Sequence, residues 1–504
     1  MKNKVQLIAY AERLSGDSSA GDLKALTRVL EGPLANVFGS VHLLPFYDSI
    51  HGADAGFDPK DHLNIDPTLG AWSDVARLAQ THDVMADVIV NHMSAQSPQF
   101  MDVRARGDAS PYSGLFLTQE KIFPNEATPA QLQAIYRPRP TPAFTPYTFA
   151  DGRTHLMWTT FTDQQIDIDV THPAGVQYLR DILTTLAQNG VRMIRLDAVG
   201  YAIKIPGSSC FMLPQTYEFI AQLSVDARAH GIEVLVEVHS YYATQIEIAA
   251  KVDCVYDFAL PPLLLHAFHF GTAKPLKHWI DIRPCNAVTV LDTHDGIGII
   301  DIGADKSDRL GKPGLVPDHE LDALVEAIHR ASNNQSRQAT GAAASNLDLY
   351  QVNCTYFDAL GGDATKYLLC RAVQFFLPGV PQVYYVGLLA GHNDMALLTR
   401  SGVGRDINRH YYTEYEIAQE LQRPVVQRLI DLIKLRNSHA AFQGVFALLS
   451  FTEQTITMEW RLGADFSQLE VNFKSANGQL RYSDAQQMVT LDFVQERVLE
   501  AQNI

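Results

Sequence analysis

The chain has 504 residues, 46% of them hydrophobic, and a formal net charge of −16 at pH 7. A chain of this length can bury a large core and still carry accessory domains. The negative charge argues against binding to nucleic acid or to an anionic membrane surface. An anionic ligand would therefore need a local cluster of basic side chains.

Cellular location is also constrained by composition. No run of about 18 apolar residues is present that could span a bilayer, and the apolar run within the N-terminal MKNKVQLIAYAERL is too short for a signal peptide. The cysteines are odd in number and show no metal-ligand spacing, so we interpret them as buried apolar residues. They are Cys210, Cys254, Cys285, Cys354 and Cys370. We expect a cytoplasmic protein, either a monomer or a homodimer.

Short apolar segments alternate with longer amphipathic segments along the chain. The predicted strands are VQLIAY (5–10), VHLLPF (41–46), VMADVIV (84–90), RMIRLDAV (192–199), EVLVEVH (233–239), VYDF (255–258), AVTVLDTH (287–294) and VPQVYYV (380–386). Between them, residues 176–190 show helical periodicity and end in Asn-Gly, and residues 72–82 open with Ser73 as a candidate N-cap. This alternation predicts an α/β fold, a (β/α)8 TIM barrel with parallel strands covered on both faces.

Two long segments interrupt this alternation. Residues 91–171, rich in Pro and aromatic residues, predict an inserted domain B after the third strand, and residues 297–361 predict a second inserted domain, B′, after the seventh. From about residue 442 polar and apolar residues alternate, which predicts a C-terminal antiparallel β domain over 442–504. The barrel itself would comprise residues 1–90, 172–296 and 362–441.

Charged side chains are found where the predicted strands end. In a (β/α)8 barrel, catalytic residues lie at the C-terminal ends of the strands. The residues at these positions are Asp87, Asn91 and His92 (third strand), Arg195 and Asp197 (fourth), Glu237 and His239 (fifth), and His294 and Asp295 (seventh). The carboxylates Asp197, Glu237 and Asp295 would therefore converge on one mouth of the barrel.

Carboxylates beside an arginine suit glycosyl transfer. A retaining mechanism needs one carboxylate as the nucleophile and one carboxylic acid to protonate the leaving oxygen. Arg195 and Asp197 share a strand face, so Arg195 would keep Asp197 ionised and oriented. Two alternatives remain open: the two residues could form a structural ion pair inside the barrel, or the Asp and His residues could bind a divalent metal ion.

The chain resembles the alpha-amylase superfamily, glycoside hydrolase family 13. DVIVNH, IRLDAV, VLVEVH and VLDTHD are similar to its four main conserved regions and occur in the same order, and QQIDIDVTHP (164–173) is similar to a further short region. Other segments resemble the family of sucrose phosphorylases: GADAGFDPKDH (52–62), AIYRPRP (134–140), DTHDGIGIIDIG (292–303) and GRDINRHYY (404–412). The resemblance covers about residues 1–440.

The resemblance implies a role for each site residue. Asp197 would be the nucleophile, Glu237 the acid/base and Asp295 the transition-state stabiliser. The glucosyl pocket would be lined by Asp54, Phe57, His92, Phe161, Arg195, His294 and Arg409. The acceptor side would be formed by Tyr136, Arg139, Tyr201, Val238, His239, Leu347, Tyr350 and Gln351.

These roles imply a hexosyltransferase of carbohydrate metabolism with sucrose and inorganic phosphate as its small-molecule partners. It would convert sucrose to α-D-glucose 1-phosphate and fructose through a covalent β-glucosyl-enzyme, with retention and without a metal or other cofactor. The alternatives are a phosphorylase for sucrose 6′-phosphate or glucosyl-glycerol-type donors, a hydrolase or transglucosidase that needs no phosphate, and a non-catalytic amylase-like scaffold. Such scaffolds usually lose their catalytic carboxylates.

Several site residues also have structural interpretations. Arg137 and Arg139 offer planar guanidinium groups to phosphate oxygens, but a Pro-rich surface turn with solvated arginines is the alternative. Phe57 and Phe161 could be platforms for a sugar or ordinary core residues. His239 could be a neutral residue that tunes Glu237. Likewise, the segment with Tyr350 and Gln351 could be a loop that only covers the barrel mouth.

Overall fold

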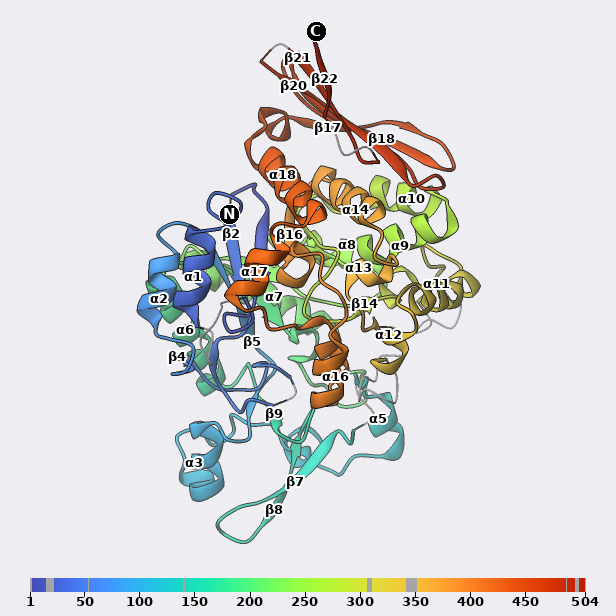
Figure 1. Cartoon of the computed structure of the whole chain (residues 1–504). Helices are drawn as coiled ribbons and strands as arrows, with labels where there is room; N and C mark the ends of the chain where they lie inside the picture. The colour runs from blue at the N-terminus through green and yellow to red at the C-terminus, as the bar shows by residue number, and fades with distance from the viewer. Residues whose placement is uncertain are drawn as a thin grey trace.

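A closed barrel of parallel strands forms the centre of the molecule, in the order β1-β16-β13-β12-β11-β10-β5-β2. The computed structural model describes residues 2–14, 22–52, 54–138, 141–305, 311–340, 351–485, 487–494 and 498–503, the last range as backbone. The barrel strands are β1 (Gln6–Ala9), β2 (Ser40–Leu43), β5 (Asp83–Ile89), β10 (Val191–Asp197), β11 (Glu233–Val236), β12 (Cys254–Asp257), β13 (Ala287–Thr289) and β16 (Val380–Tyr384). The predicted fold class and all eight predicted strands are confirmed (Figure 1).

Continuous apolar sequence explains why these segments form barrel strands. Leu7, Ile8, Val41 and Leu43 are fully buried, because one face of each strand packs inside the barrel and the other packs against the helices. The surrounding helices are α1 (Leu23–Glu31), α2 (Trp72–Leu78), α6 (Pro173–Gln188), α7 (Pro214–Ala229), α8 (Tyr242–Ala249), α9 (Leu260–Phe270), α10 (Lys274–Ile282), α14 (Ala364–Phe376) and α18 (Pro424–Ser438).

The predicted helix ends can be compared with α6 and α2. Helix α6 ends at the predicted Asn-Gly, with Asn189 as its C-cap and Gly190 at a φ of 83°. The prediction of Ser73 as an N-cap is wrong, because Trp72 is already helical and Ala71 occupies the cap position. The Asp74 carboxylate accepts a hydrogen bond from the Ala71 N–H at 2.9 Å and so satisfies the exposed start of the helix.

The segment after β5 builds a separate group of elements at the lower end of Figure 1. It contains β6 (His92–Ser94), α3 (Pro98–Arg106), α4 (Gln119–Ile122), α5 (Pro129–Ala134), β7 (Phe144–Thr148), β8 (Thr154–Trp158) and β9 (Gln165–Asp167). β6 pairs antiparallel with β9, and β7 pairs antiparallel with β8. The β6–β9 pairing sets His92 opposite Asp167.

The segment between β13 and β16 contributes the other long connection. It contains β14 (Ile297–Gly298), η3 (Ile300–Ile302), α11 (Asp318–Ala331), α12 (Gln335–Gln338), β15 (Gln351–Val352) and α13 (Tyr356–Ala359). The short antiparallel pair β14–β15 brings Gln351 opposite Gly298. Both long connections therefore lie at the same end of the barrel as the C-terminal ends of its strands.

The C-terminal residues form an antiparallel sheet, as predicted. Its strands are β17 (Val445–Phe451), β18 (Thr455–Leu462), β19 (Asp465–Asn472), β20 (Asn477–Asp484), β21 (Gln487–Asp492) and β22 (Val498–Asn503). Met458, Leu469 and Leu480 are fully buried on one face, and Trp460 donates from Nε1 to the Phe376 carbonyl of α14 at 2.6 Å. Figure 1 places this sheet at the end of the molecule opposite the inserted segment after β5.

Two expectations from composition concern burial and membranes. Cys210, Cys254, Cys354 and Cys370 are buried, but Cys285 is exposed, so the expectation of five buried cysteines is wrong at that position. Cys285 lies in the connection between α10 and β13, where the chain runs along the surface. Within the described residues, no helix is long and apolar enough to cross a membrane.

Candidate active site

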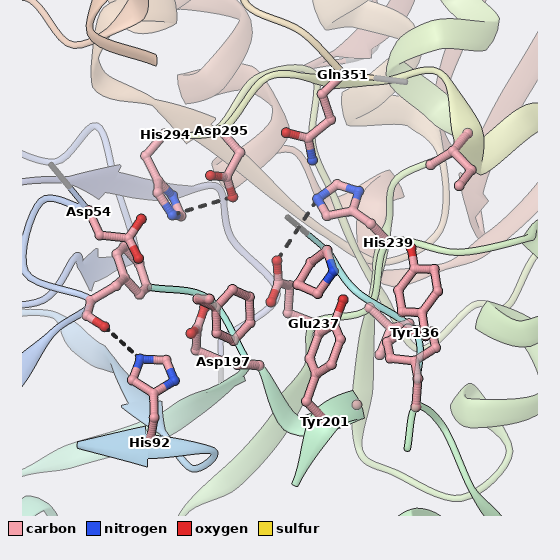
Figure 2. A pocket seen from close by; sticks show the side chains of 18 of the residues that line it. Asp54, His92, Tyr136, Asp197, Tyr201, Glu237, His239, His294, Asp295 and Gln351 are labelled. Carbon is pink, nitrogen blue, oxygen red and sulfur yellow. Dashed lines mark hydrogen bonds and ion pairs between the residues drawn. The ribbon is translucent and has the colours of Figure 1, made fainter. Parts of the chain in front are cut away.

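A cavity opens at the C-terminal ends of the barrel strands, and most of the predicted site residues line it (Figure 2). They come from the strand ends, from the connection after β2, from the inserted segment after β5 and from β15. The predicted residues on its wall are Asp54, Phe57, His92, Tyr136, Phe161, Asp197, Tyr201, Glu237, Val238, His239, His294, Asp295 and Gln351. Arg139, Leu347 and Tyr350 lie outside the described residues.

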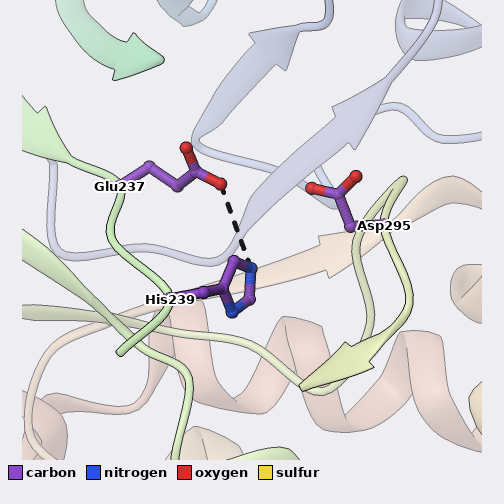
Figure 3. A group of neighbouring side chains, drawn as sticks. All are labelled: Glu237, His239 and Asp295. Atoms are coloured by element: carbon purple, nitrogen blue, oxygen red, sulfur yellow. Dashed lines mark ion pairs between the residues drawn. The ribbon is translucent and has the colours of Figure 1, made fainter. Parts of the chain in front are cut away.

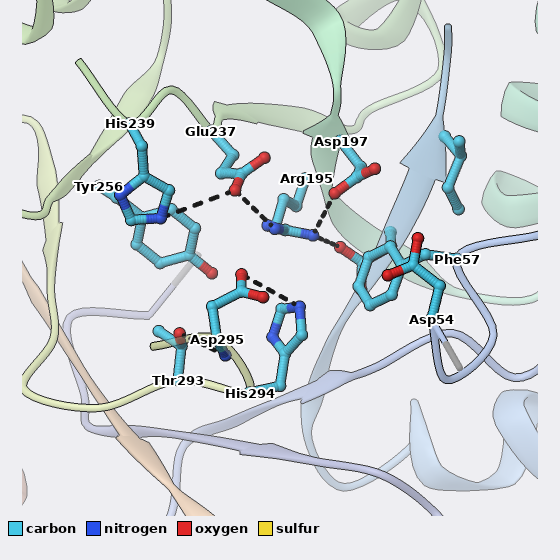
Figure 4. A network of polar contacts seen from close by, with 12 residues as sticks. Asp54, Phe57, Arg195, Asp197, Glu237, His239, Tyr256, Thr293, His294 and Asp295 are labelled. Carbon is cyan, nitrogen blue, oxygen red and sulfur yellow. Dashed lines mark hydrogen bonds and ion pairs between the residues drawn. The ribbon is translucent and has the colours of Figure 1, made fainter. Parts of the chain in front are cut away.

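Arg195 lies beneath this wall, with 2% of its surface exposed. Its Nη1 donates to Asp87 Oδ1 at 2.5 Å and lies 3.1 Å from Asp197 Oδ1, while its Nη2 lies 3.1 Å from Glu237 Oε1 (Figure 4). Arg195, which was predicted to line the glucosyl pocket, therefore lies beneath the residues that form its wall. The guanidinium is the floor of the site, and it fixes two wall carboxylates with one rigid fork.

Burial and Arg195 act in opposite directions on the neighbouring carboxylates. Burial raises the pKa of Asp197 well above its ordinary value, although Arg195 opposes that rise. For Asp87, Arg195 and His42 outweigh burial and lower the pKa to about 2. Arg195 thus favours the ionised form of Asp197, as expected, but burial and the nearby carboxylates of Glu237 and Asp87 act in the other direction.

Asp295 lies across the cavity in an ion pair with Arg405, whose Nη1 is 2.8 Å from Asp295 Oδ1. Burial would raise the pKa of Asp295, but Arg405, His294 and Arg195 outweigh it and hold that pKa far below the usual range. Arg405 also lies 3.7 Å from Asp54 Oδ1. Asp295 is therefore a fixed negative charge facing the cavity.

Arg405 was not predicted, whereas Arg409 was predicted to line the glucosyl pocket. That prediction is wrong: Arg409 is fully buried and donates from Nε to the His294 carbonyl at 3.0 Å. Arg405 lies within the short helix η5 (Gly404–Asn408) and Arg409 is its C-cap; this turn directs Arg405 to the cavity and Arg409 into the core. The motif GRDINRH contains both arginines. The sequence therefore indicates that an arginine of this motif reaches the site, but it does not indicate which of the two does so.

Aromatic rings form two sides of the cavity. Phe57 stacks on His294, with ring centroids 4.8 Å apart and planes 7° apart. On the other side Phe161 meets Tyr201 edge to face at 5.2 Å, and Tyr136 packs against Phe211 at 4.7 Å. Phe57 and Phe161 therefore line the cavity as well as packing. Sequence reasoning missed Pro138, Ala198, Gly200, Phe211, Ile300 and Arg405 among the lining residues.

The histidines of the wall fall into two classes. Burial lowers the pKa of His92 and lowers that of His294 to about 3, so both rings are neutral. For His239, burial works against the charged form, but the contact between Nδ1 and Asp301 Oδ2 at 2.9 Å raises its pKa to about 9. The contact with Asp301 therefore favours a charged His239 over the neutral alternative.

Arg137, the second residue of the YRPRP loop, is bonded to the backbone of neighbouring segments. Arg137 Nη2 donates to the carbonyls of Thr141, Pro142 and Thr159 at 3.0 Å each. This bonding holds the loop against the hairpin of the inserted segment. Nη2 is thus engaged with backbone, as in the structural alternative for Arg137, whereas its Nε and Nη1 are buried without a hydrogen-bond partner among the described residues.

Glu237, His239 and Asp295 have ligand atoms within 4.8 Å of one another, a spacing that a metal ion could bridge (Figure 3). However, Glu237 and Asp295 are already paired with Arg195 and Arg405, respectively. Asp301 raises the pKa of His239 to about 9, which disfavours the neutral ring that a metal ligand requires. The donor set thus fits a metal poorly.

A second cationic group joins the inserted segment to the barrel. The Lys204 ammonium lies 2.7 Å from Asp167 Oδ2 and donates to Asn91 Oδ1 at 2.9 Å and to the Tyr201 carbonyl. Its side chain is 2% exposed and that of Asp167 is fully buried. An internal lysine therefore neutralises this oxygen cluster beside the cavity.

Comparison with known proteins agrees with this geometry. Residues 11–260 match the family described as "Alpha amylase, catalytic domain". The chain is 54% identical to the sucrose phosphorylase of Agrobacterium vitis, covering 96% of this chain and 98% of that protein. It is 55% identical to the sucrose phosphorylase of Bifidobacterium adolescentis, covering 95% and 93%. The crystal structure of sucrose 6F-phosphate phosphorylase from Thermoanaerobacter thermosaccharolyticum superimposes with a TM-score of 0.88 at 35% identity, covering 98% of this chain and 99% of that one.

Proposed function

Since the chain belongs to the sucrose phosphorylase family within the alpha-amylase superfamily, we propose that it converts sucrose and inorganic phosphate to α-D-glucose 1-phosphate and fructose. The two sucrose phosphorylases are 54% and 55% identical to it, against 35% for the sucrose 6F-phosphate phosphorylase. This difference favours sucrose itself as the donor. The observation that carries the proposal is the pairing of Asp197 and Glu237 on one guanidinium, with Asp295 facing them across the cavity.

In the first half of the reaction, Asp197 attacks the anomeric carbon of the glucosyl unit while Glu237 protonates the departing fructose oxygen. A β-glucosyl-enzyme forms. Retaining enzymes need two carboxyl groups about 5–5.5 Å apart. The two terminal nitrogens of the Arg195 guanidinium lie 3.1 Å from an oxygen of Asp197 and 3.1 Å from an oxygen of Glu237. This contact with one guanidinium supports the short separation of retaining enzymes rather than the wider spacing of inverting enzymes.

The proton balance of the pair fits this assignment. Burial raises the pKa of Asp197, and Arg195, which contacts both carboxyl groups, opposes that rise. The reaction needs Asp197 as a carboxylate and a proton on Glu237 for delivery to the fructose oxygen. Arg195 stabilises the Asp197 carboxylate in that state.

The wall of the cavity suits a glucosyl ring. Phe57 offers an apolar face, and Asp54 and Arg405 offer an acceptor and donors for hydroxyl groups. His294 is neutral, so it can donate one hydrogen bond without adding charge, whereas the single N–H of neutral His92 donates from Nε2 to the Phe57 carbonyl at 3.0 Å. Asp295, held ionised, stabilises the positive charge that develops on the ring in the oxocarbenium-like transition state.

In the second half, fructose leaves and phosphate enters the acceptor side formed by Tyr136, Tyr201, Val238, His239 and Gln351, with Arg139, Leu347 and Tyr350 as further proposed members. Phosphate then attacks the anomeric carbon and releases α-D-glucose 1-phosphate with net retention. Because the chain is acidic overall, phosphate binding needs local positive charge. His239 supplies such a charge on the acceptor side.

The test is turnover of sucrose with and without inorganic phosphate, with α-D-glucose 1-phosphate and free glucose measured together. We expect phosphate-dependent glucose 1-phosphate and little glucose. Glucose release at the same rate in both conditions would make the enzyme a hydrolase. Turnover only with sucrose 6′-phosphate or a glucosylglycerol would move it to the related phosphorylases.

A further inference from the structure

Asp301, in η3, is a buried carboxylate that the proposed reaction does not use. It is fully buried and accepts three hydrogen bonds, all from one strand end and the helix that follows it. The donors are His239 Nδ1 at 2.9 Å, the Ser240 N–H at 3.1 Å and Gln245 Nε2 at 3.2 Å. Gly298 leaves room for this contact, since a Cβ there would come within 2.2 Å of Asp301 Oδ2.

The other ring nitrogen of His239 faces the cavity. His239 Nε2 is buried, has no hydrogen-bond partner among the described residues, and lies 3.9 Å from Glu237 Oε1. Phe258 stacks on the ring at 3.8 Å and 14°, which fixes the ring plane. With Nδ1–H directed at Asp301, a lone pair on Nε2 would face carboxylate oxygens of Glu237 and Asp295, whereas an N–H there is attracted by them.

The charges around His239 differ in how they are compensated. Glu237 is paired with Arg195 and Asp295 with Arg405. Among the described residues, the ion-pair partner of Asp301 is His239. The Asp301–His239 pair is therefore a separate unit, and the positive charge of the ring depends chiefly on Asp301.

We propose that Asp301 is a positioning residue for the acceptor half of the reaction: it holds His239 as an imidazolium whose Nε2–H faces the acceptor side, and thereby favours phosphate over water as the group that attacks the glucosyl-enzyme. This inference rests on the proposed function. Asp301 itself does not touch the substrate. A fixed cation in a buried site attracts an anionic acceptor and gives no comparable advantage to a neutral one.

The test compares Asp301→Asn with the wild type in two reactions: phosphorolysis of sucrose, and hydrolysis of sucrose without phosphate. Asn preserves the shape of the side chain and removes its charge. We expect the KM for phosphate to rise at least tenfold, while hydrolysis changes less than threefold and the KM for sucrose is unchanged. In a His239→Gln background, Asp301→Asn should have no further effect on the KM for phosphate.

Asp257→Asn is the matched control, because Asp257 is also fully buried and pairs with Arg283 and Trp279 away from the cavity. It should lower the melting temperature without changing the KM for phosphate. Equal losses of hydrolysis and phosphorolysis in Asp301→Asn, or an unchanged KM for phosphate, would overturn the inference. A wild type without phosphate-dependent product would instead overturn the proposed function, before any variant is measured.

A measurement on the wild type covers the case in which Asp301→Asn does not fold. ¹⁵N NMR of the protein with labelled histidines reports whether one or both imidazole nitrogens of His239 are protonated at pH 7.5. The His239 signals are assigned by their loss in His239→Gln. Two protonated nitrogens are expected. A single protonated nitrogen would refute the imidazolium, and with it the role of Asp301.

Discussion

Arg405 bridges Asp295 and Asp54 across the mouth of the cavity, at 2.8 and 3.7 Å from one oxygen of each. The three residues come from connections after different barrel strands, so this cation ties together loops far apart in the sequence. It also fixes the orientation of two carboxylates that face the glucosyl position. The arginine four residues later, Arg409, instead supports the His294 backbone from inside the core.

These two arginines should respond differently to substitution. Arg405→Ala should raise the KM for sucrose and lower kcat/KM by about 10- to 100-fold, the effect of removing a hydrogen-bonding cation, while the melting temperature stays close to that of the wild type. Arg409→Ala should mainly lower the melting temperature, because it removes a buried side chain. Kinetics and thermal unfolding of both variants check this; the opposite pattern would reassign the two residues.

Asp197→Ala should abolish glucosyl transfer, because it removes the carboxylate that attacks the anomeric carbon. Among the described wall residues, Glu237 also contacts Arg195, but through Nη2, whereas Asp197 contacts Nη1. Glu237→Gln should leave Asp197 able to attack but slow fructose release, since no acid protonates the leaving oxygen. A donor with a leaving group that needs no protonation, such as α-glucosyl fluoride, should restore the first step in Glu237→Gln and not in Asp197→Ala. Turnover of sucrose by Asp197→Ala would refute the assignment.

The Asp301–His239 pair predicts a pH-dependent contribution to stability. The pKa of His239 is raised to about 9 from an ordinary value of 6.5. A raised folded-state pKa stabilises the fold fully below pH 6.5, and this stabilisation is lost as pH rises through about 9. The charged groups facing the ring are Asp301, Glu237 and Asp295. The difference in melting temperature between wild type and Asp301→Asn should therefore be larger at pH 6 than at pH 10. A difference independent of pH would contradict the ion pair.

Lys204 should matter for stability, because it is the cation of a buried oxygen cluster. Lys204→Met leaves the buried Asp167 carboxylate without its cation and should cost about 3–5 kcal/mol of unfolding free energy. Lys274→Met is the control: Lys274 pairs with Glu453 at the surface, and its loss should leave the melting temperature unchanged. Denaturant unfolding measures both; similar values for the two variants would contradict a structural role of Lys204.

We also expect activity to be independent of bound metal. Dialysis against a chelator should change neither sucrose turnover nor the melting temperature. The cavity carboxylates Glu237 and Asp295 are paired with Arg195 and Arg405, and Asp167 is paired with Lys204. Loss of activity on chelation, restored by a divalent ion, would show that the group of Glu237, His239 and Asp295 binds a metal after all.

The sequence by itself determined the barrel, its eight strands and the C-terminal sheet. These depend on local patterns: continuous apolar runs for buried parallel strands, alternation for the outer sheet, and Asn-Gly at the end of α6. The strand-end carboxylates followed from the same pattern, because a barrel directs every strand end to one face. Residues such as Asp197 and Glu237 could therefore be placed together before any side chain was positioned.

Only the tertiary structure decided the direction and partners of individual side chains. Arg405 and Arg409 lie in one motif, and the turn of η5 alone sends the first to the cavity and the second to the core. Asp301 and His239 are 62 residues apart, so their contact, and the charge it places on the ring, arises from the packing of η3 against the end of β11. Burial and pairing set the protonation of such groups, and neither is a local property of the chain.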